Sequence, residues 1–121
     1  MKLTLLGTGC PSIDYKRCGA SNLVSTKKTK ILIDCGSGVT QRLNQSKNSS
    51  ADIDALLLTH LHTDHVIDLY QLIISSWHSD RDSIWKIYGP KGTKKFVDKI
   101  FLAWKSEREL RISYEKRKSI K

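Results

Sequence analysis

The feature that most constrains the fold is a six-residue segment, His60 to His65, which holds three of the four histidines and one aspartate. A continuous apolar run, Ala55-Leu56-Leu57-Leu58, precedes it and predicts a largely buried strand from Asp54 to Thr59. The stretch that follows, Val66 to Trp77, repeats apolar residues at intervals of three and four, which is typical of a helix packed on a core. We therefore expect the cluster at a strand-to-helix junction.

Strands and helices alternate along the rest of the chain. Further strands are expected at Lys2 to Gly7, Ser21 to Ser25, Lys30 to Asp34 and Ile84 to Tyr88, and helices at Val39 to Leu43 and from Thr93 onward, with Thr93 as the cap. No repeat or linker interrupts this order, and 121 residues fit one domain. The sequence predicts a single α/β domain over residues 1–121.

The chain is strongly basic. Lysine and arginine outnumber aspartate and glutamate by 21 to 12, a formal charge of +9, and such a surplus favours polyanionic partners such as RNA. Much of the charge lies in the Lys27 to Lys30 turn and in the tail from Lys105 to Lys121, where solvated charge is the simpler interpretation. The tail also alternates Leu110, Ile112 and Tyr114, as one more strand would.

Cysteine usage and hydropathy argue against an exported or membrane protein. Three cysteines, Cys10, Cys18 and Cys35, form an odd set without the C-x2–4-C spacing, which favours neither disulfides nor a thiolate zinc site. No run approaches the ~18 apolar residues of a membrane span, and Met1 to Gly7 is too short for a signal sequence. A cytoplasmic protein with no membrane partner is expected.

The residue types in the cluster suit divalent transition metals. In an extended backbone His60 and His62 point the same way, so one ion can bind both. Asp64 and His65 fall on the incoming helical turn, where they would bind a second ion. Imidazole and carboxylate together favour Zn²⁺, with Mn²⁺ or Fe²⁺ as competitors. Two adjacent ions activate a hydroxide that attacks a phosphoryl, sulfuryl or carbonyl centre.

Two polar residues outside the cluster have open interpretations. Asp34 ends a predicted strand, where its carboxylate would either orient a metal-binding imidazole or stabilise the glycine turn that follows it. His78 lies just beyond the predicted apolar helix and is expected at the surface.

The segment from Thr59 to His65 resembles the signature of the metallo-β-lactamase-fold hydrolases. Other landmarks of that superfamily follow in the same order: Gly7-Thr8-Gly9, Ile33-Asp34-Cys35-Gly36 and Ile87-Tyr88-Gly89-Pro90. Their details look most like the ribonuclease Z and arylsulfatase-like branch. The resemblance implies a four-layer αββα sandwich with two metal ions at the sheet edge, and it allows a homodimer.

By position, the resemblance makes His60 and His62 ligands of the first metal, and Asp64 and His65 ligands of the second. In nuclease members the residue at Asp64 also takes part in proton transfer, so it is the candidate catalytic residue. Such enzymes supply a third histidine, a bridging aspartate and a last histidine from their second half, whereas no histidine follows His78 here. We therefore expect an αββα fold truncated to about its N-terminal half and incomplete at the C-terminus.

The resemblance has two local departures and leaves three functions open. Asp68 stands where many members carry glycine, and Tyr70 where proline is common. The first function is hydrolysis of phosphodiesters, as in tRNA 3′ processing, which the basic charge favours. The second is hydrolysis of sulfate esters or other small esters, which the likeness at Ser76-Trp77 and at Tyr88-Gly89-Pro90 favours. The third is a catalytically inactive fragment with a half-built metal site.

Overall fold

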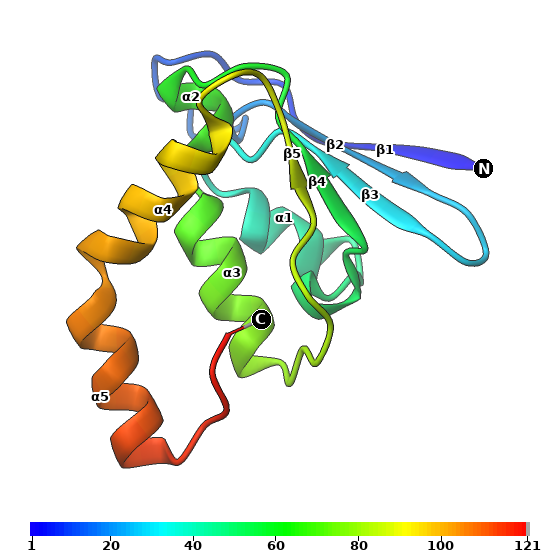
Figure 1. The fold of residues 1–121 in the computed structure, drawn as a ribbon. Helices are drawn as coiled ribbons and strands as arrows, with labels where there is room; N and C mark the ends of the chain where they lie inside the picture. Colours follow the sequence, from blue (N-terminus) through cyan, green and yellow to red (C-terminus); the bar gives the residue numbers. More distant parts are fainter. Residues whose placement is uncertain (121) are drawn as a thin grey trace.

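The computed structural model describes residues 1–120, so Lys121 lies outside the described residues. Its elements in chain order are β1 (Lys2–Gly7), β2 (Ser21–Ser25), β3 (Lys30–Ile33), α1 (Val39–Gln45), the 3-10 turn η1 (Ser50–Asp52), β4 (Ala55–Leu57), α2 (Thr63–Val66), α3 (Leu69–His78), β5 (Ile87–Tyr88), α4 (Thr93–Ala103) and α5 (Lys105–Glu115) (Figure 1). Among these helices none has both the length and the apolar character needed to cross a bilayer.

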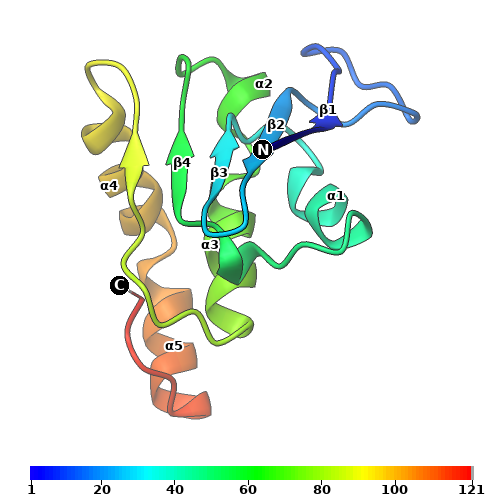
Figure 2. The same cartoon turned by 90° about the vertical axis from the view of Figure 1, so that its right-hand side faces the viewer.

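The five strands form one mixed sheet in the order β1-β2-β3-β4-β5. The first three strands are antiparallel, and β3, β4 and β5 are parallel. Helices cross between the parallel strands, as parallel pairing requires. All the helices of residues 1–120 lie on the same side of the sheet, and within this part of the chain no helix covers the other side (Figures 1 and 2).

The two faces of the sheet differ in burial because side chains alternate along each strand. On the helical side, Leu23, Leu32 and Leu56 are buried in a core that α1 and α3 complete. The opposite face carries several apolar residues that are open to solvent. Leu3 and Leu5 of β1 are 62% and 65% exposed, and Leu57 and Tyr88 lie on the same face.

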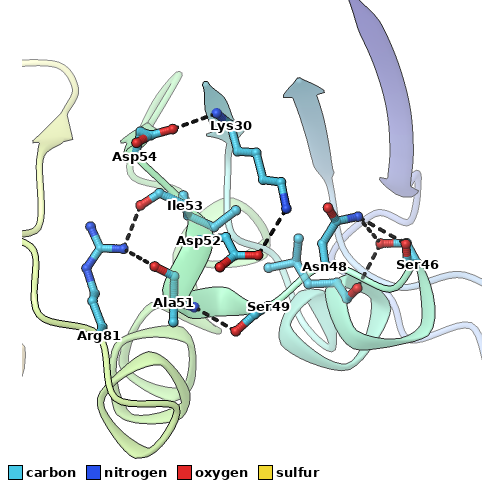
Figure 3. A network of polar contacts seen from close by, with 10 residues as sticks. Lys30, Ser46, Asn48, Ser49, Ala51, Asp52, Ile53, Asp54 and Arg81 are labelled. Carbon is cyan, nitrogen blue, oxygen red and sulfur yellow. Dashed lines mark hydrogen bonds and ion pairs between the residues drawn. The ribbon is translucent and has the colours of Figure 1, made fainter. Parts of the chain in front are cut away.

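A polar network fixes the start of β4, the strand that leads to the histidine cluster (Figure 3). On one side the backbone N–H of Lys30 donates to Oδ2 of Asp54 at 2.7 Å. On the other side Nη1 of Arg81 donates to the carbonyl oxygens of Ala51 and Ile53 at 3.0 and 2.6 Å. These bonds hold β4 between β3 and the loop after α3.

The helix predicted from Val66 to Trp77 is divided. α2 ends at Val66 and α3 begins at Leu69. The cause is a long-range contact: the backbone N–H of Asp68 donates to the carbonyl of Cys35 at 3.1 Å, so it cannot continue the α-helical ladder of α2.

Three predicted strands are shorter than expected, and one predicted cap is wrong. β3 stops before Asp34, and β4 covers only Ala55–Leu57. β5 covers only Ile87–Tyr88, because the Ile84 carbonyl accepts a hydrogen bond from Nη2 of Arg81. Thr93 is the first residue of α4 and its hydroxyl donates to the Pro90 carbonyl at 2.8 Å. The cap position belongs to Gly92, whose φ of 103° is accessible to glycine at little cost.

The strand predicted within Lys105 to Lys121 is also wrong, because residues Lys105–Glu115 form helix α5. Acidic and basic side chains four residues apart stabilise a helix. Such pairs join Lys105 to Glu109, Glu107 to Arg111, and Arg111 to Glu115. A strand at this place would need a neighbouring strand to pair with, whereas α5 lies away from the sheet, beyond α4 (Figure 1).

Candidate metal centre

The histidine cluster and Asp34 meet at one edge of the sheet. Because β3 and β4 run parallel, with Ile33 paired to Leu57, their carboxyl ends lie side by side. Asp34 follows Ile33 in a left-handed conformation, φ 61°, and its backbone N–H donates to the Leu57 carbonyl at 2.8 Å. The buried carboxylate is thereby directed at the residues that follow β4.

The Asp34 carboxylate orients His65. Its Oδ1 accepts a hydrogen bond from the backbone N–H of Thr59 at 2.8 Å, and its Oδ2 lies 2.8 Å from Nδ1 of His65. A carboxylate can only accept, so Nδ1 carries the proton and Nε2 presents its lone pair. This is the arrangement by which carboxylates orient metal-binding imidazoles.

A hydroxyl relay orients His60 in the same way. The Thr59 hydroxyl donates its proton to Asp34 Oδ2 at 2.8 Å. Having no second proton, Thr59 Oγ1 must accept from Nδ1 of His60, 2.9 Å away. Nε2 of His60 therefore also presents a lone pair. Sequence reasoning gave Thr59 no role, although its position directly before the first histidine is the signal that points to this contact.

The histidine rings lie close together. The ring of His60 is centred 4.6 Å from that of His62 and 4.0 Å from that of His65. Oδ2 of Asp64 lies 3.5 Å from Nε2 of His65. Two ligands of one tetrahedral zinc ion, each bonded at about 2.1 Å, are about 3.4 Å apart, so this pair has the separation of ligands that share an ion.

The donor chemistry of the cluster fits divalent transition metals, with imidazole nitrogens and a carboxylate side by side. Within residues 1–120, however, no three His, Cys, Asp or Glu side chains converge as ligands of one ion. The structure brings His60, His62, Asp64, His65 and Asp34 together as pairs of donors.

His78 does not join the cluster, and it is not the surface residue that was expected. It ends α3 and is half-buried, and its Nε2 is shielded from solvent without a hydrogen-bond partner among the described residues. The packing of Trp77 against its ring, with centroids 5.7 Å apart, accounts for part of this burial.

The turn after Asp34 packs directly on the backbone of α2. The N–H of Cys35 donates to the carbonyl of His65 at 2.7 Å. A Cβ atom on Gly36 would lie 2.4 Å from the carbonyl oxygen of Asp64, so only glycine fits. Burial first, then the charges of Asp68 and Asp34, raises the pKa of the Cys35 thiol, which stays neutral.

Asp68 and Tyr70, the two residues that depart from the superfamily pattern, each make specific side-chain contacts. Oδ2 of Asp68 accepts hydrogen bonds from the backbone N–H and the hydroxyl of Thr40, each at 2.7 Å, and so joins α1 to the segment after the cluster. Tyr70 stacks on Trp104 with ring centroids 5.0 Å apart and donates its hydroxyl proton to Glu107 at 2.8 Å. Tyr70 therefore anchors α5 to α3.

Comparison with known proteins supports the resemblance. A family model described as anti-Pycsar protein Apyc1 matches residues 1–109. The chain is 40% identical over 118 residues to a ribonuclease Z of Mycolicibacterium gilvum (strain PYR-GCK), which covers 94% of this chain and 41% of the relative. The chain thus spans about two fifths of the length of the curated relatives it matches.

Solved structures of ribonuclease Z-type proteins have the same fold as this chain. Human tRNase Z, short form, superposes with a TM-score of 0.78 at 28% identity, covering 85% of this chain and 40% of that one. The long form RNase Z from yeast, at 22% identity and a TM-score of 0.70, covers 87% of this chain and 16% of its own, and shows the fold alone. The predicted α/β metallo-β-lactamase fold and the ribonuclease Z-like resemblance are confirmed, and the match corresponds to the N-terminal part of those chains.

Proposed function

Because the chain belongs to the family of the anti-Pycsar protein Apyc1, we propose that it supplies the histidine-rich part of a metal-dependent phosphodiesterase. His60 and His62 hold one Zn²⁺ ion, and Asp64 and His65 hold a second, with Mn²⁺ or Fe²⁺ as alternatives. The observation that carries this proposal is the contact of Asp34 with His65, which leaves Nε2 of that imidazole facing Asp64 at 3.5 Å.

The chain's own residues prepare this chemistry. When bound, the ions would supply a water molecule ionised near neutral pH and would neutralise charge on the phosphoryl oxygens. Asp34 keeps the proton of His65 on Nδ1, and Thr59 does the same for His60, so both imidazoles are ready as ligands. Asp64 would act as the proton-transfer group, because its carboxylate lies 3.5 Å from Nε2 of His65 within the cluster.

Two classes of phosphodiester are candidates, each favoured by one observation. The identity to ribonuclease Z favours an RNA substrate, such as the 3′ end of a tRNA precursor. Membership in the Apyc1 family favours a cyclic nucleotide. The net charge of +9 favours the RNA, because an RNA presents many phosphates to the basic side chains whereas a cyclic mononucleotide presents one phosphate.

Completion of each metal site requires ligands beyond the donor pairs among residues 1–120. The uncovered face of the sheet, with Leu3, Leu5, Leu57 and Tyr88 open to solvent, offers a surface on which a further layer carrying such ligands would pack. The alternative is a chain that folds and holds metal weakly without turnover.

The experiment compares metal content and hydrolysis in the protein and in two variants. We expect zinc-dependent cleavage of a precursor tRNA or a cyclic nucleotide, and none of an aryl sulfate. His62→Ala should abolish it, whereas His78→Ala, which removes a histidine outside the cluster, should keep it. Unchanged metal binding and cleavage in the His62 variant would refute the assignment. Metal bound without cleavage in the unmodified protein would favour the inactive alternative.

A further inference from the structure

Asp34 has a backbone conformation that few residues with a side chain adopt. Its φ of 61° lies in the left-handed region, where a Cβ atom crowds the following carbonyl oxygen. Aspartate tolerates this region better than most residues, but such a conformation persists only where the surrounding structure holds it in place. Because the left-handed turn directs the Asp34 carboxylate at Thr59 and His65, any contact that holds this backbone also orients the histidine cluster.

The side chain of Ser21 contacts that backbone from the neighbouring strand. Ser21 is the first residue of β2 and is 1% exposed, and its hydroxyl donates to the carbonyl of Asp34 at 2.7 Å. The ladder between β2 and β3 ends one step earlier, at the pair of Asn22 and Ile33. The left-handed turn takes Asp34 out of the ladder, and the hydroxyl of Ser21 supplies a donor to its buried carbonyl.

Two backbone hydrogen bonds join the same two segments. The N–H of Gly19 donates to the Ser37 carbonyl at 2.8 Å, and the N–H of Gly36 donates to the Ala20 carbonyl at 3.1 Å. Together with the hydroxyl of Ser21, they hold the glycine turn after β3 by three hydrogen bonds. Of these three, only the bond from Ser21 is made by a side chain, so a single substitution can remove it.

The turn transmits this constraint to His65 through two contacts. The backbone N–H of Cys35 donates to the carbonyl of His65 at 2.7 Å. The Asp34 carboxylate accepts the ring proton of the same histidine, with Oδ2 2.8 Å from Nδ1. The backbone and the ring of His65 are therefore both held by the turn that Ser21 contacts, and a displaced turn would release both.

A second buried serine makes the same kind of bond away from the cluster. Ser76 of α3 is 0% exposed, and its hydroxyl donates to the carbonyl of Ile73 at 2.7 Å. Its oxygen also accepts from Nε1 of Trp85 at 3.1 Å. Ser76 thus matches Ser21 in burial and in the length of its bond, but these partners lie outside the histidine cluster.

We propose that Ser21 is a positioning residue of the metal centre: its hydroxyl holds Asp34 in the left-handed conformation, and Asp34 in turn keeps the proton of His65 on Nδ1. Without that hydroxyl the turn relaxes, and the ring of His65 adopts both neutral tautomers. The tautomer with its proton on Nε2 has no lone pair there for a metal ion. The inference rests on the proposed function in taking His65 as a metal ligand.

The test compares Ser21→Ala with Ser76→Ala in two measurements. The first is the nitrogen NMR spectrum of the histidine rings in metal-free protein at one mildly alkaline pH, with His65 assigned from a His65→Gln variant. We expect one tautomer, protonated on Nδ1, in the unmodified protein and in Ser76→Ala, and a mixture in Ser21→Ala. The second is zinc titration, in which Ser21→Ala should bind about tenfold more weakly, the lower end of the loss seen when a direct partner of a ligating histidine is removed.

Stability separates the proposed role from a general loss of packing. Both alanine variants lose a buried hydrogen bond of the same length, so both should unfold at lower urea concentration, whereas only Ser21→Ala should change the spectrum and the zinc affinity. Ser21→Thr, which keeps the hydroxyl, should keep the single tautomer, and it replaces Ser21→Ala in the test if the alanine variant does not fold.

Two results would overturn the inference. One is a single Nδ1-protonated tautomer of His65 in folded Ser21→Ala, and the other is a tautomer mixture in Ser76→Ala or Ser21→Thr. Failure of the unmodified protein to bind zinc would instead refute the proposed function. The spectrum is recorded without metal, so it tests the role of Ser21 whatever the zinc titration shows.

Discussion

Oδ2 of Asp34 lies 2.8 Å from Nδ1 of His65, although 31 positions separate the two residues in the chain. The contact exists because the parallel strands β3 and β4 end at one edge and because Asp34 turns with a φ of 61°. The same carboxylate accepts the backbone N–H and the hydroxyl of Thr59. One buried side chain thus fixes both ends of the histidine cluster.

Replacement of Asp34 by alanine should destabilise the protein by about 2–3 kcal/mol, because buried donors of Thr59 and His65 lose their acceptor. The affinity for zinc should fall about 10–100-fold, as it does when the group that orients a metal-binding histidine is removed. Urea unfolding and zinc titration measure the two effects. Asp14→Ala, at an exposed loop carboxylate, is the control and should leave zinc affinity unchanged.

Gly36→Ala should destabilise the fold by about 1–3 kcal/mol, the usual cost of forcing an extra methyl group into a packed site. The new Cβ would lie 2.4 Å from the Asp64 carbonyl, so either the glycine turn or α2 must move. Thermal unfolding measures the loss, and nitrogen chemical shifts of the histidine rings report the displacement. Ser37→Ala, one exposed position further on, should unfold like the unmodified protein; an equal loss there would argue against the steric cause.

The Tyr70 hydroxyl should make stability depend on alkaline pH. Burial, followed by the hydrogen bond to Glu107, raises the pKa of Tyr70 from 10.0 to about 12. Because the folded pKa is raised, this stabilisation is complete below pH 10.0 and is lost as the pH rises toward about 12. Tyr70→Phe keeps the stacking on Trp104, loses about 1 kcal/mol at neutral pH, and should lack that alkaline loss.

Urea unfolding across this pH range, followed by tryptophan fluorescence, measures the effect on Tyr70. Tyr114→Phe is the matched control, since that side chain is 84% exposed and its removal should not change the profile. Identical alkaline profiles for the unmodified protein and the Tyr70 variant would contradict the role given to this hydrogen bond.

The uncovered face of the sheet should bind hydrophobic dyes and promote self-association. Leu3→Ser with Leu5→Ser removes two exposed leucines without opening the core, so we expect lower dye fluorescence and a smaller sedimentation coefficient at high concentration. The free energy of unfolding should change little. Leu32→Ser, by contrast, places a hydroxyl in the buried core and should unfold the protein.

Short-range patterns predicted most of the elements correctly. The strands at Lys2–Gly7 and Ser21–Ser25 have the expected bounds, because alternation and turn residues are encoded locally. Errors arose where a distant group decides the structure. The break between α2 and α3 depends on the Cys35 carbonyl, and the short β5 depends on Arg81. In residues Lys105–Glu115 the alternating apolar residues predicted a strand, but ion pairs four residues apart stabilise a helix there.

The sequence by itself determined the chemistry of this protein: which donors stand together from His60 to His65, and which superfamily they indicate. Those facts are local, because adjacent residues cannot be far apart in any fold. Only the tertiary structure decided that Asp34 and Thr59 set the protonated nitrogens of His65 and His60. The contacts of Asp34 with Thr59 and His65 join residues distant in the chain, and they form only when strand order and packing bring them together.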